Sequence, residues 1–251
     1  MIWKEIRDEN LGCNSFLLGD EVSGKGLVVD PLGSAGAMEY ILTAQDLGIS
    51  IEHVVETHIH ADHRSAAKEL AGNLGIKITF GKNAQVNFDY VPVEDGSLIS
   101  LGSIEVEVME TPGHTMESIS LVVRDRHRGD EPILVMSGDS LFVGDVGRPD
   151  LNDADDEIIR KYSEKQFHSI QKIMKLPDFT ELHPAHYGAS PCGGLFMSKK
   201  PSSTIGYERR YNVFTAIKDK GLFVEKQIKL LKPPPEEAIA IRAENLGPIK
   251  E

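Results

Sequence analysis

Segment 58–63 (HIHADH) constrains the fold and chemistry of this chain more than any other part of its sequence. It follows the apolar run 51–55 and contains four potential metal ligands within six positions: His58, His60, Asp62 and His63. Burying this many imidazole and carboxylate groups is costly unless a cation is bound to them. Imidazole nitrogens and carboxylate oxygens are ligands that suit zinc, iron and manganese. The segment therefore predicts a metal centre at the end of a buried strand.

The local geometry of this segment can bring its members together. Because residues i and i+2 of an extended chain point the same way, His58 and His60 can face one pocket. Asp62 and His63 fall where a predicted helix, 64–74, begins, and the positive helix end could direct them to the same space. The alternative is a set of polar strand-end residues with Asp62 as the N-cap, which explains four adjacent ligands less well.

A second candidate segment, 111–115 (TPGHT), follows the alternating strand predicted over 104–109. Its Pro-Gly pair indicates a tight turn that would present His114 at the sheet edge. Alone, this segment would be a turn with an exposed histidine. Beside the first motif, it predicts a third ligand.

Two further segments carry potential ligands. Asp139 follows the apolar run 133–136, and two histidines, His183 and His186, follow the run 179–182. The proline between these histidines disfavours a helix, so a loop presents them. We favour His186 over His183, although spacing alone does not choose between them. Turn chemistry explains poorly why several separate strands end in ligand residues.

Short apolar runs punctuated by glycine and proline predict strands interspersed with helices. The expected strands are 15–18, 26–30, 51–56, 76–80, 98–100, 104–109, 119–123 and 133–136. The expected helices are 35–47, 64–74, 155–175, 207–218, 222–231 and 236–244. This order favours an α/β protein with two packed sheets covered by helices. No linker divides the chain, so we expect one domain over 1–251 with a helical C-terminal extension from about residue 205.

Composition and charge limit the kinds of partner and the cellular compartment that we expect. The formal charge of −12 argues against nucleic acid as a partner, because phosphate binding needs a basic surface. No apolar run approaches the roughly 20 residues of a membrane span, and the N-terminus lacks the apolar region of a signal peptide. We therefore expect a cytoplasmic protein. The two cysteines, Cys13 and Cys192, are not expected to form a disulfide there, and we assign Cys13 to core packing.

The order HxHxDH, TPGHT, GD and PAH resembles that of the metallo-β-lactamase superfamily. Segments 137–151 (SGDSLFVGDVGRPDL), 188–193 (GASPCG) and 201–212 (PSSTIGYERRYN) are similar to the persulfide dioxygenase branch, which is related to glyoxalase II. Within that branch they resemble bacterial forms often fused to rhodanese domains. The resemblance covers about 14 to 212.

The resemblance implies an αββα sandwich, two mixed sheets covered by helices, with the metal at one edge. It implies one Fe(II) per chain held by His58, His114 and Asp139, which leaves open positions for substrate and O₂. The positions that match additional metal contacts of hydrolase relatives would here orient ligands and waters: His60, Asp62, His63 and His186.

The implied reaction oxidises a low-molecular-weight persulfide with O₂ to sulfite and a free thiol. Glutathione, coenzyme A or another thiol could be the carrier. Because the chain ends at Glu251, we expect no rhodanese cysteine loop to follow, and we expect any sulfur transfer to need a separate rhodanese sulfurtransferase. Relatives form dimers or tetramers, so we expect a homo-oligomer.

The resemblance also suggests catalytic and pocket residues beyond the metal ligands. Asp62 is a catalytic candidate beside the metal, and Tyr187 could border the substrate pocket. Arg148 could hold an anionic thiol substrate or shape its loop. A salt bridge from Arg148 to Asp150 or Asp153 is an equally good interpretation from sequence alone.

Cys192 has two open interpretations. It could be a small buried hydrophobic residue. Its loop, 190–194 (SPCGG), could instead bring it to the pocket, where the thiol would contact or accept sulfane sulfur.

Two competing functions use the same residues. A dinuclear zinc thioester hydrolase of the glyoxalase II type would use a bridging hydroxide as its nucleophile. Its two sets of ligands would be His58, His60, His114 and Asp139 on one side, and Asp62, His63 and His186 on the other. One or two zinc ions would then replace the iron. A non-catalytic metal-binding sulfur carrier is the third possibility, and the intact ligand set argues against it.

Overall fold

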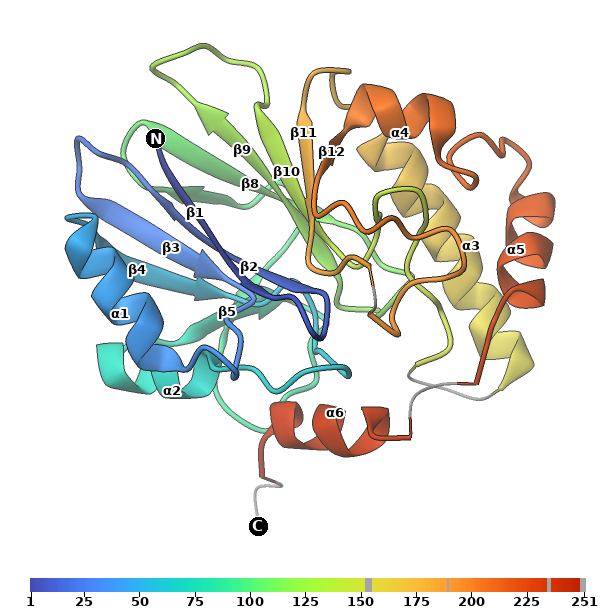
Figure 1. Ribbon diagram of the computed structural model, residues 1–251, viewed down its shortest axis with the longest axis horizontal. Helices are drawn as coiled ribbons and strands as arrows, with labels where there is room; N and C mark the ends of the chain where they lie inside the picture. Colours follow the sequence, from blue (N-terminus) through green and yellow to red (C-terminus); the bar gives the residue numbers. More distant parts are fainter. Residues whose placement is uncertain (152–154, 189, 234–235, 249–251) are drawn as a thin grey trace.

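The first half of the chain forms a six-stranded sheet in a computed structural model that describes residues 1–151, 155–188, 190–233 and 236–248 (Figure 1). Its strands, in spatial as well as chain order, are β1 (Ile2–Asp8), β2 (Cys13–Gly19), β3 (Lys25–Val29), β4 (Ser50–Val55), β5 (Ile78–Gly81) and β6 (Val91–Val93). Strands β1 to β3 pair antiparallel, and β3 to β6 pair parallel.

A second six-stranded sheet packs against the first. Its strands are β7 (Leu98–Ser100), β8 (Ile104–Glu110), β9 (Ile119–Asp125), β10 (Leu134–Gly138), β11 (Glu181–Pro184) and β12 (Ser203–Thr204). They lie in the order β12-β11-β10-β9-β8-β7, with β10 and β11 parallel and the other neighbours antiparallel.

Helices cover the outer face of each sheet (Figure 1). Helices α1 (Ala37–Asp46) and α2 (Ala67–Leu74) share an apolar cluster with the first sheet. Helices α3 (Asp156–Ile173), α4 (Ile205–Tyr211) and α5 (Lys220–Lys229) lie on the other side, where α3 to α5 share an apolar cluster with the second sheet. The predicted αββα sandwich is therefore confirmed.

Alternation of side chains along the strands explains the layers. In β2, Leu17 packs toward the helices, whereas Phe16 and Leu18 pack between the sheets. Successive strand residues point to opposite faces of the sheet. One apolar strand can therefore contribute both to the core between the sheets and to the core between sheet and helices.

The structure corrects some predicted boundaries. The helix expected over 207–218 ends at Tyr211, because the backbone at Asn212 is extended, with φ of −73° and ψ of 128°. The Asn212 side chain is held there by donating to the carbonyls of Phe142 and Asp145. The sequence analysis did not assign β1, β6, β11 or β12. Strand β6 contains a proline and lies at the sheet edge, where proline is tolerated.

Strand directions bring several strand ends to one edge of the sandwich. The carboxyl ends of β4, β8, β10 and β11 meet there, together with the start of β2. The sixth helix, α6 (Ala238–Leu246), lies below this edge in Figure 1.

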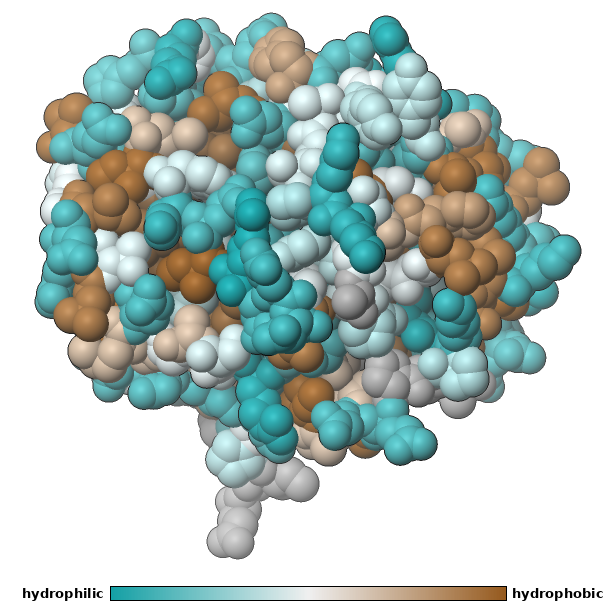
Figure 2. All heavy atoms as spheres, viewed as in Figure 1, coloured by the Kyte–Doolittle hydropathy of each residue, from teal (hydrophilic) through white to brown (hydrophobic). Residues whose placement is uncertain are grey.

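The face of the molecule seen in Figure 2 is largely polar. Figure 2 shows a face on which hydrophilic side chains are spread between smaller groups of hydrophobic ones. Among the described residues, no helix is both long enough and apolar enough to span a membrane.

Candidate metal centre

His58 presents one bare ring nitrogen at the shared edge. The hydroxyl of Thr57 donates to Asp30, so it can only accept from His58 Nδ1, 3.0 Å away. This assigns the proton to Nδ1 and leaves Nε2 with a free lone pair. Burial first, and then the neighbouring imidazoles, lower the pKa of His58 well below its usual value. His58 is therefore neutral and able to bind a metal.

His114 is oriented in the same way. Its Nδ1 donates to the backbone carbonyl of Arg148 at 2.7 Å, which leaves Nε2 facing Asp139. Gly147 permits this approach, because a Cβ there would lie 1.9 Å from the Asp139 carbonyl oxygen and 3.1 Å from His114 Nδ1.

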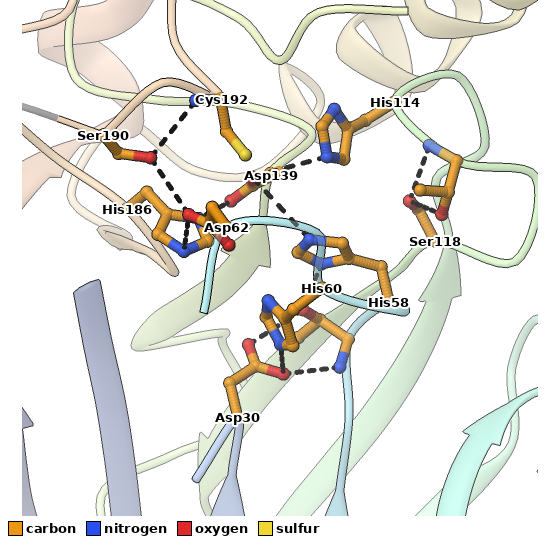
Figure 3. A network of polar contacts seen from close by, with 12 residues as sticks. Asp30, His58, His60, Asp62, His114, Ser118, Asp139, His186, Ser190 and Cys192 are labelled. Atoms are coloured by element: carbon orange, nitrogen blue, oxygen red, sulfur yellow. Dashed lines mark hydrogen bonds and ion pairs between the residues drawn. The ribbon is translucent and has the colours of Figure 1, made fainter. Parts of the chain in front are cut away.

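The two imidazoles converge on one oxygen of Asp139 (Figure 3). Asp139 Oδ2 lies 3.7 Å from His58 Nε2 and 3.4 Å from His114 Nε2. His58 Nε2 and Asp139 Oδ2 are buried without a hydrogen-bond partner. Such orphaned atoms are costly unless they bind something. These three donors therefore fit a metal ion with two histidine ligands and one carboxylate.

His60 does not join this group. Its Nε2 lies 3.1 Å from Asp30 Oδ1 and 3.1 Å from Glu56 Oε2, in a separate buried cluster (Figure 3). Burial alone would lower the pKa of His60, but the Asp30 carboxylate raises it well above its usual value. The expectation that His58 and His60 face one pocket as i and i+2 residues of a strand is wrong, because β4 ends at Val55, before either histidine.

His186 connects the centre to a second group of polar residues. Its Nδ1 lies 2.5 Å from Asp139 Oδ1, and its Nε2 lies 2.7 Å from Asp62 Oδ2. Burial would lower the pKa of His186, but Asp139 and Asp62 raise it well above its usual value. His63 Nδ1 lies 3.2 Å from the other oxygen of Asp62. The structure thus brings Asp62, His63 and His186 together, as predicted.

The expectation that the start of a helix positions Asp62 and His63 was wrong. Asp62 and His63 precede the helix by several residues, because α2 begins only at Ala67. Asn245 of α6 shapes their loop instead: its side chain donates to the carbonyls of His60 and His63 and accepts from the Ser65 amide. Sequence offered no signal for a contact across some 180 residues.

His183 lies away from the centre. Its ring contacts Glu5 of β1 at 3.3 Å and Glu181 at 3.0 Å, and it packs against Trp3. The preference for His186 over His183 as a site residue agrees with this placement.

Arg148 is engaged by its neighbours. Its guanidinium binds both carboxylate oxygens of Asp150, at 2.7 and 2.8 Å, and also donates to the carbonyls of Pro191 and Lys232. The other proposed partner, Asp153, lies outside the described residues. These contacts support a role in shaping the loops around His114, while binding of substrate by Arg148 stays a prediction.

Cys192 reaches the centre. Its thiol groups with Asp139 and His186, with one donor atom from each residue within 4.8 Å of the others. Burial, followed by the carboxylates of Asp62 and Asp139, raises the pKa of this thiol well above its usual value. Tyr187 lies farther out, where its amide donates to the carbonyl of Gly12 at 2.8 Å. Roles for both residues toward substrate stay predictions.

Cys13 is the site residue that sequence reasoning missed. It is fully buried, as core packing requires, but its sulfur lies 3.9 Å from His63 Nδ1. The assignment to core packing is therefore incomplete. The start of β2 lies at the edge where β4 ends, so only the strand pairing could have revealed this contact.

The centre and the fold identify the class of protein. A family model described as the metallo-beta-lactamase superfamily matches residues 8–186. The chain belongs to this superfamily.

Individual similar proteins indicate which branch of the superfamily this chain resembles. Persulfide dioxygenase ETHE1 of Bos taurus is 28% identical over 225 residues, which cover 89% of this chain and 79% of that protein. A crystal structure of ETHE1 from Myxococcus xanthus is 25% identical with a TM-score of 0.82 and covers 98% of both chains. A metallo-beta-lactamase structure from Staphylococcus aureus is 31% identical with a TM-score of 0.87, over 98% of this chain and 72% of that one. The ETHE1 similarities support the persulfide dioxygenase branch.

Proposed function

We propose that this protein is an Fe(II)-dependent persulfide dioxygenase with one catalytic iron per chain. Its substrates would be O₂ and the persulfide of a small thiol such as glutathione or coenzyme A. The balanced reaction is RSSH + O₂ + H₂O → RSH + H₂SO₃. The sulfane sulfur loses four electrons, O₂ gains them, and the S–S bond breaks to release the thiol.

The observation that carries this proposal is the separation of His60 from the three-donor group. A hydrolytic site of the glyoxalase II type would need His60 beside His58 and His114 on one metal. Here Asp30 and Glu56 occupy the Nε2 side of His60, and neither of its ring nitrogens joins the group of His58, His114 and Asp139. Two histidines and one carboxylate with open positions are typical of non-haem Fe(II) oxygenases.

The residues of the chain would divide the remaining work. His58, His114 and Asp139 would hold the iron, which supplies the redox chemistry for persulfide and O₂ when bound. The Arg148 carbonyl and the Thr57 hydroxyl fix the two imidazoles, and His186 fixes Asp139. All three ligands are buried, so the site excludes most water. Cys192 would line the pocket as a neutral thiol, and a catalytic role predicts slower persulfide turnover in Cys192→Ser at unchanged iron content.

The test combines metal analysis with O₂ consumption by the Fe(II)-loaded chain across a panel of persulfides. We expect one iron per chain and one sulfite formed for each O₂ consumed. His114→Ala should lose both iron and O₂ uptake, whereas His60→Gln should keep its iron. Two zinc ions, no iron and no persulfide-dependent O₂ uptake would reject the proposal and favour the thioester hydrolase.

The cellular setting belongs to the same proposal. We propose a cytoplasmic enzyme that forms a homodimer or homotetramer and exchanges sulfur with a separate rhodanese sulfurtransferase. Size-exclusion chromatography with light scattering would check the oligomer, and a single monomeric species would contradict it.

A further inference from the structure

Two carboxylates lie side by side where the first sheet ends in the histidine segment. Val29 of β3 pairs with Val55 of β4 in parallel register. Asp30 and Glu56 are the residues that follow this pair, one after each strand. Both are buried: Asp30 is 0% exposed and Glu56 is 2% exposed. The sheet thus places two buried carboxylates at the start of the loop that carries His60.

The ring of His60 faces these carboxylates and not the three-donor centre. Its Nε2 lies 3.1 Å from Asp30 Oδ1 and 3.1 Å from Glu56 Oε2. In Figure 3, Asp30 lies on the far side of the His60 ring from Asp139. Asp30, Glu56 and His60 form a donor group of their own, with one atom from each within 4.8 Å of the others. The direction of the ring therefore follows from its two carboxylate neighbours.

Packing alone does not fix the ring of His60. A cavity lies beside it, and its walls include Glu56, His58 and Ser65 as well as His60 itself. The other ring nitrogen, Nδ1, is buried without a hydrogen-bond partner. The backbone is held, because Asn245 donates to the His60 carbonyl at 2.9 Å. A turn of the ring therefore requires the release of its carboxylate contacts and not a movement of the loop.

The two carboxylates differ in their other contacts. Asp30 accepts from the amide and the hydroxyl of Thr57, at 2.7 and 2.8 Å, and its φ is 49°. Aspartate tolerates this left-handed conformation, so Asp30 also turns the chain. Ser65 donates to Oε1 of Glu56, which directs Oε2 to His60. Asp30 therefore shapes the backbone, whereas the contacts of the Glu56 carboxylate serve to hold His60.

We propose that Glu56 is a positioning residue that holds His60 off the metal and so keeps the centre at two histidines and one carboxylate. This inference rests on the proposed function, in which that ligand set leaves positions open for persulfide and O₂. Three histidine ligands on one ion are instead found in catalytic zinc sites. Glu56 thus sets the number of histidine ligands and, through it, the chemistry that the centre supports.

Holding the ring in this direction requires both carboxylates. Two contacts on Nε2 fix where the ring lies, whereas a single contact lets the ring pivot. Without Glu56, Asp30 remains on Nε2, and Nδ1 is left to reach the metal. Metal-bound histidines commonly donate their other ring N–H to a carboxylate. Asp30 alone would therefore support His60 as a ligand.

The experiment compares crystal structures of the zinc-loaded full chain as wild type and as Glu56→Leu, which removes the carboxylate at similar volume. In the wild type, His58 and His114 should be the histidine ligands of the ion that Asp139 binds. In Glu56→Leu, a nitrogen of His60 should join them at about 2.0–2.1 Å from zinc. His60 on this ion in the wild type, or off it in Glu56→Leu, would overturn the proposal.

Glu117→Leu is the matched control. Glu117 is also a buried carboxylate that contacts this loop, but it accepts from the Ile59 amide at 3.2 Å. This variant should keep two histidine ligands. A third histidine on the ion would show that any loosening of the loop releases His60, and the proposal would then be wrong.

Zinc affinity gives a second readout in solution. It should rise in Glu56→Leu by roughly 10–100-fold, a change of the size that neighbours of metal ligands produce. Adding His60→Gln to this variant should abolish the rise, because the gain comes from the third imidazole. An unchanged affinity in Glu56→Leu, or a rise that survives the second substitution, would contradict the role of Glu56.

Glu56→Gln covers the case in which Glu56→Leu does not fold, since it keeps the shape of the side chain and removes its charge. His60 should join the ion there too, and two histidine ligands would overturn the proposal. These readouts involve neither persulfide nor O₂. A wild type with two histidine ligands but no persulfide-dependent O₂ uptake would reject the dioxygenase and leave the role of Glu56 standing.

Discussion

At the scale of single residues, the centre depends on how closely backbone segments approach one another. Gly147 lies against the backbone of Asp139 and the ring of His114, with space for a hydrogen but not for a methyl group. The same contact lets the next residue, Arg148, offer its carbonyl to His114. A glycine in the segment after β10 is thus part of the metal centre although it carries no ligand.

Replacing Gly147 with alanine should damage the metal centre. The added Cβ forces the loop away from His114, at a cost of about 1–3 kcal/mol by analogy with overpacked cores. We expect lower unfolding free energy in urea and reduced bound metal in the same preparation. Gly72→Ala is the control, because nothing lies within 4 Å of a Cβ at that helical position. Equal metal content in the two variants would contradict this account.

The grouping of the three candidate ligands could be predicted from sequence because each follows an apolar strand. His58, His114 and Asp139 meet for this reason, since several strand ends lie at one edge. The direction of His60 could not be predicted, because the period-two rule applies only within a strand. The place of Cys13 depends on strand pairing, which local sequence does not encode.

At the scale of elements, α6 holds the histidine loop in place. Asn245 makes three hydrogen bonds to backbone atoms of His60, His63 and Ser65. The loop between β4 and α2 has no regular structure of its own, so these bonds satisfy backbone groups that would otherwise be unpaired. The helix itself was predictable, over 236–244 against Ala238–Leu246 observed, but its docking site was not.

Asn245→Ala should therefore destabilise the histidine loop after β4 and weaken metal binding. Loss of the amide leaves buried backbone groups unpaired, at about 1–3 kcal/mol each. We expect faster amide hydrogen exchange in the loop after β4 and weaker metal binding. Glu244→Gln is the matched control: it loses only the exposed ion pair with Arg64, and exposed ion pairs contribute little to stability because solvent screens them. Identical exchange in the two variants would show that α6 does not support the loop.

At the scale of the whole molecule, the two sheets are joined by more than apolar packing. His183 of β11 lies between them, against the ring of Trp3 from β1 and that of Phe16 from β2. Its Nδ1 also lies 3.3 Å from Glu5 of β1. The sandwich could be predicted from alternating strands, but β1 and β11 were missed because neither has a clear apolar pattern. This polar contact between the sheets could therefore not be predicted from the sequence.

This contact predicts a specific sensitivity to acid. The hydrogen bond with His183 is the main cause that lowers the pKa of Glu5 from 4.5 to about 2. A carboxyl group with a depressed pKa in the folded state stabilises the protein above its unfolded pKa. Its contribution should be complete above pH 4.5 and should be lost as the pH falls toward 2. Wild type should lose more unfolding free energy across this window than Glu5→Gln, and should be the more stable of the two at pH 6.

Urea unfolding of both proteins at several pH values from 6 to 2 would measure this difference. Glu181→Gln is the control, because Glu181 also lies 3.0 Å from His183 but its side chain is 62% exposed and screened by solvent. Its unfolding free energy should follow that of the wild type. Because every other acidic group is shared, the difference between wild type and Glu5→Gln isolates one carboxylate. Parallel curves for these two proteins would mean that the Glu5–His183 contact does not help to hold the sheets together.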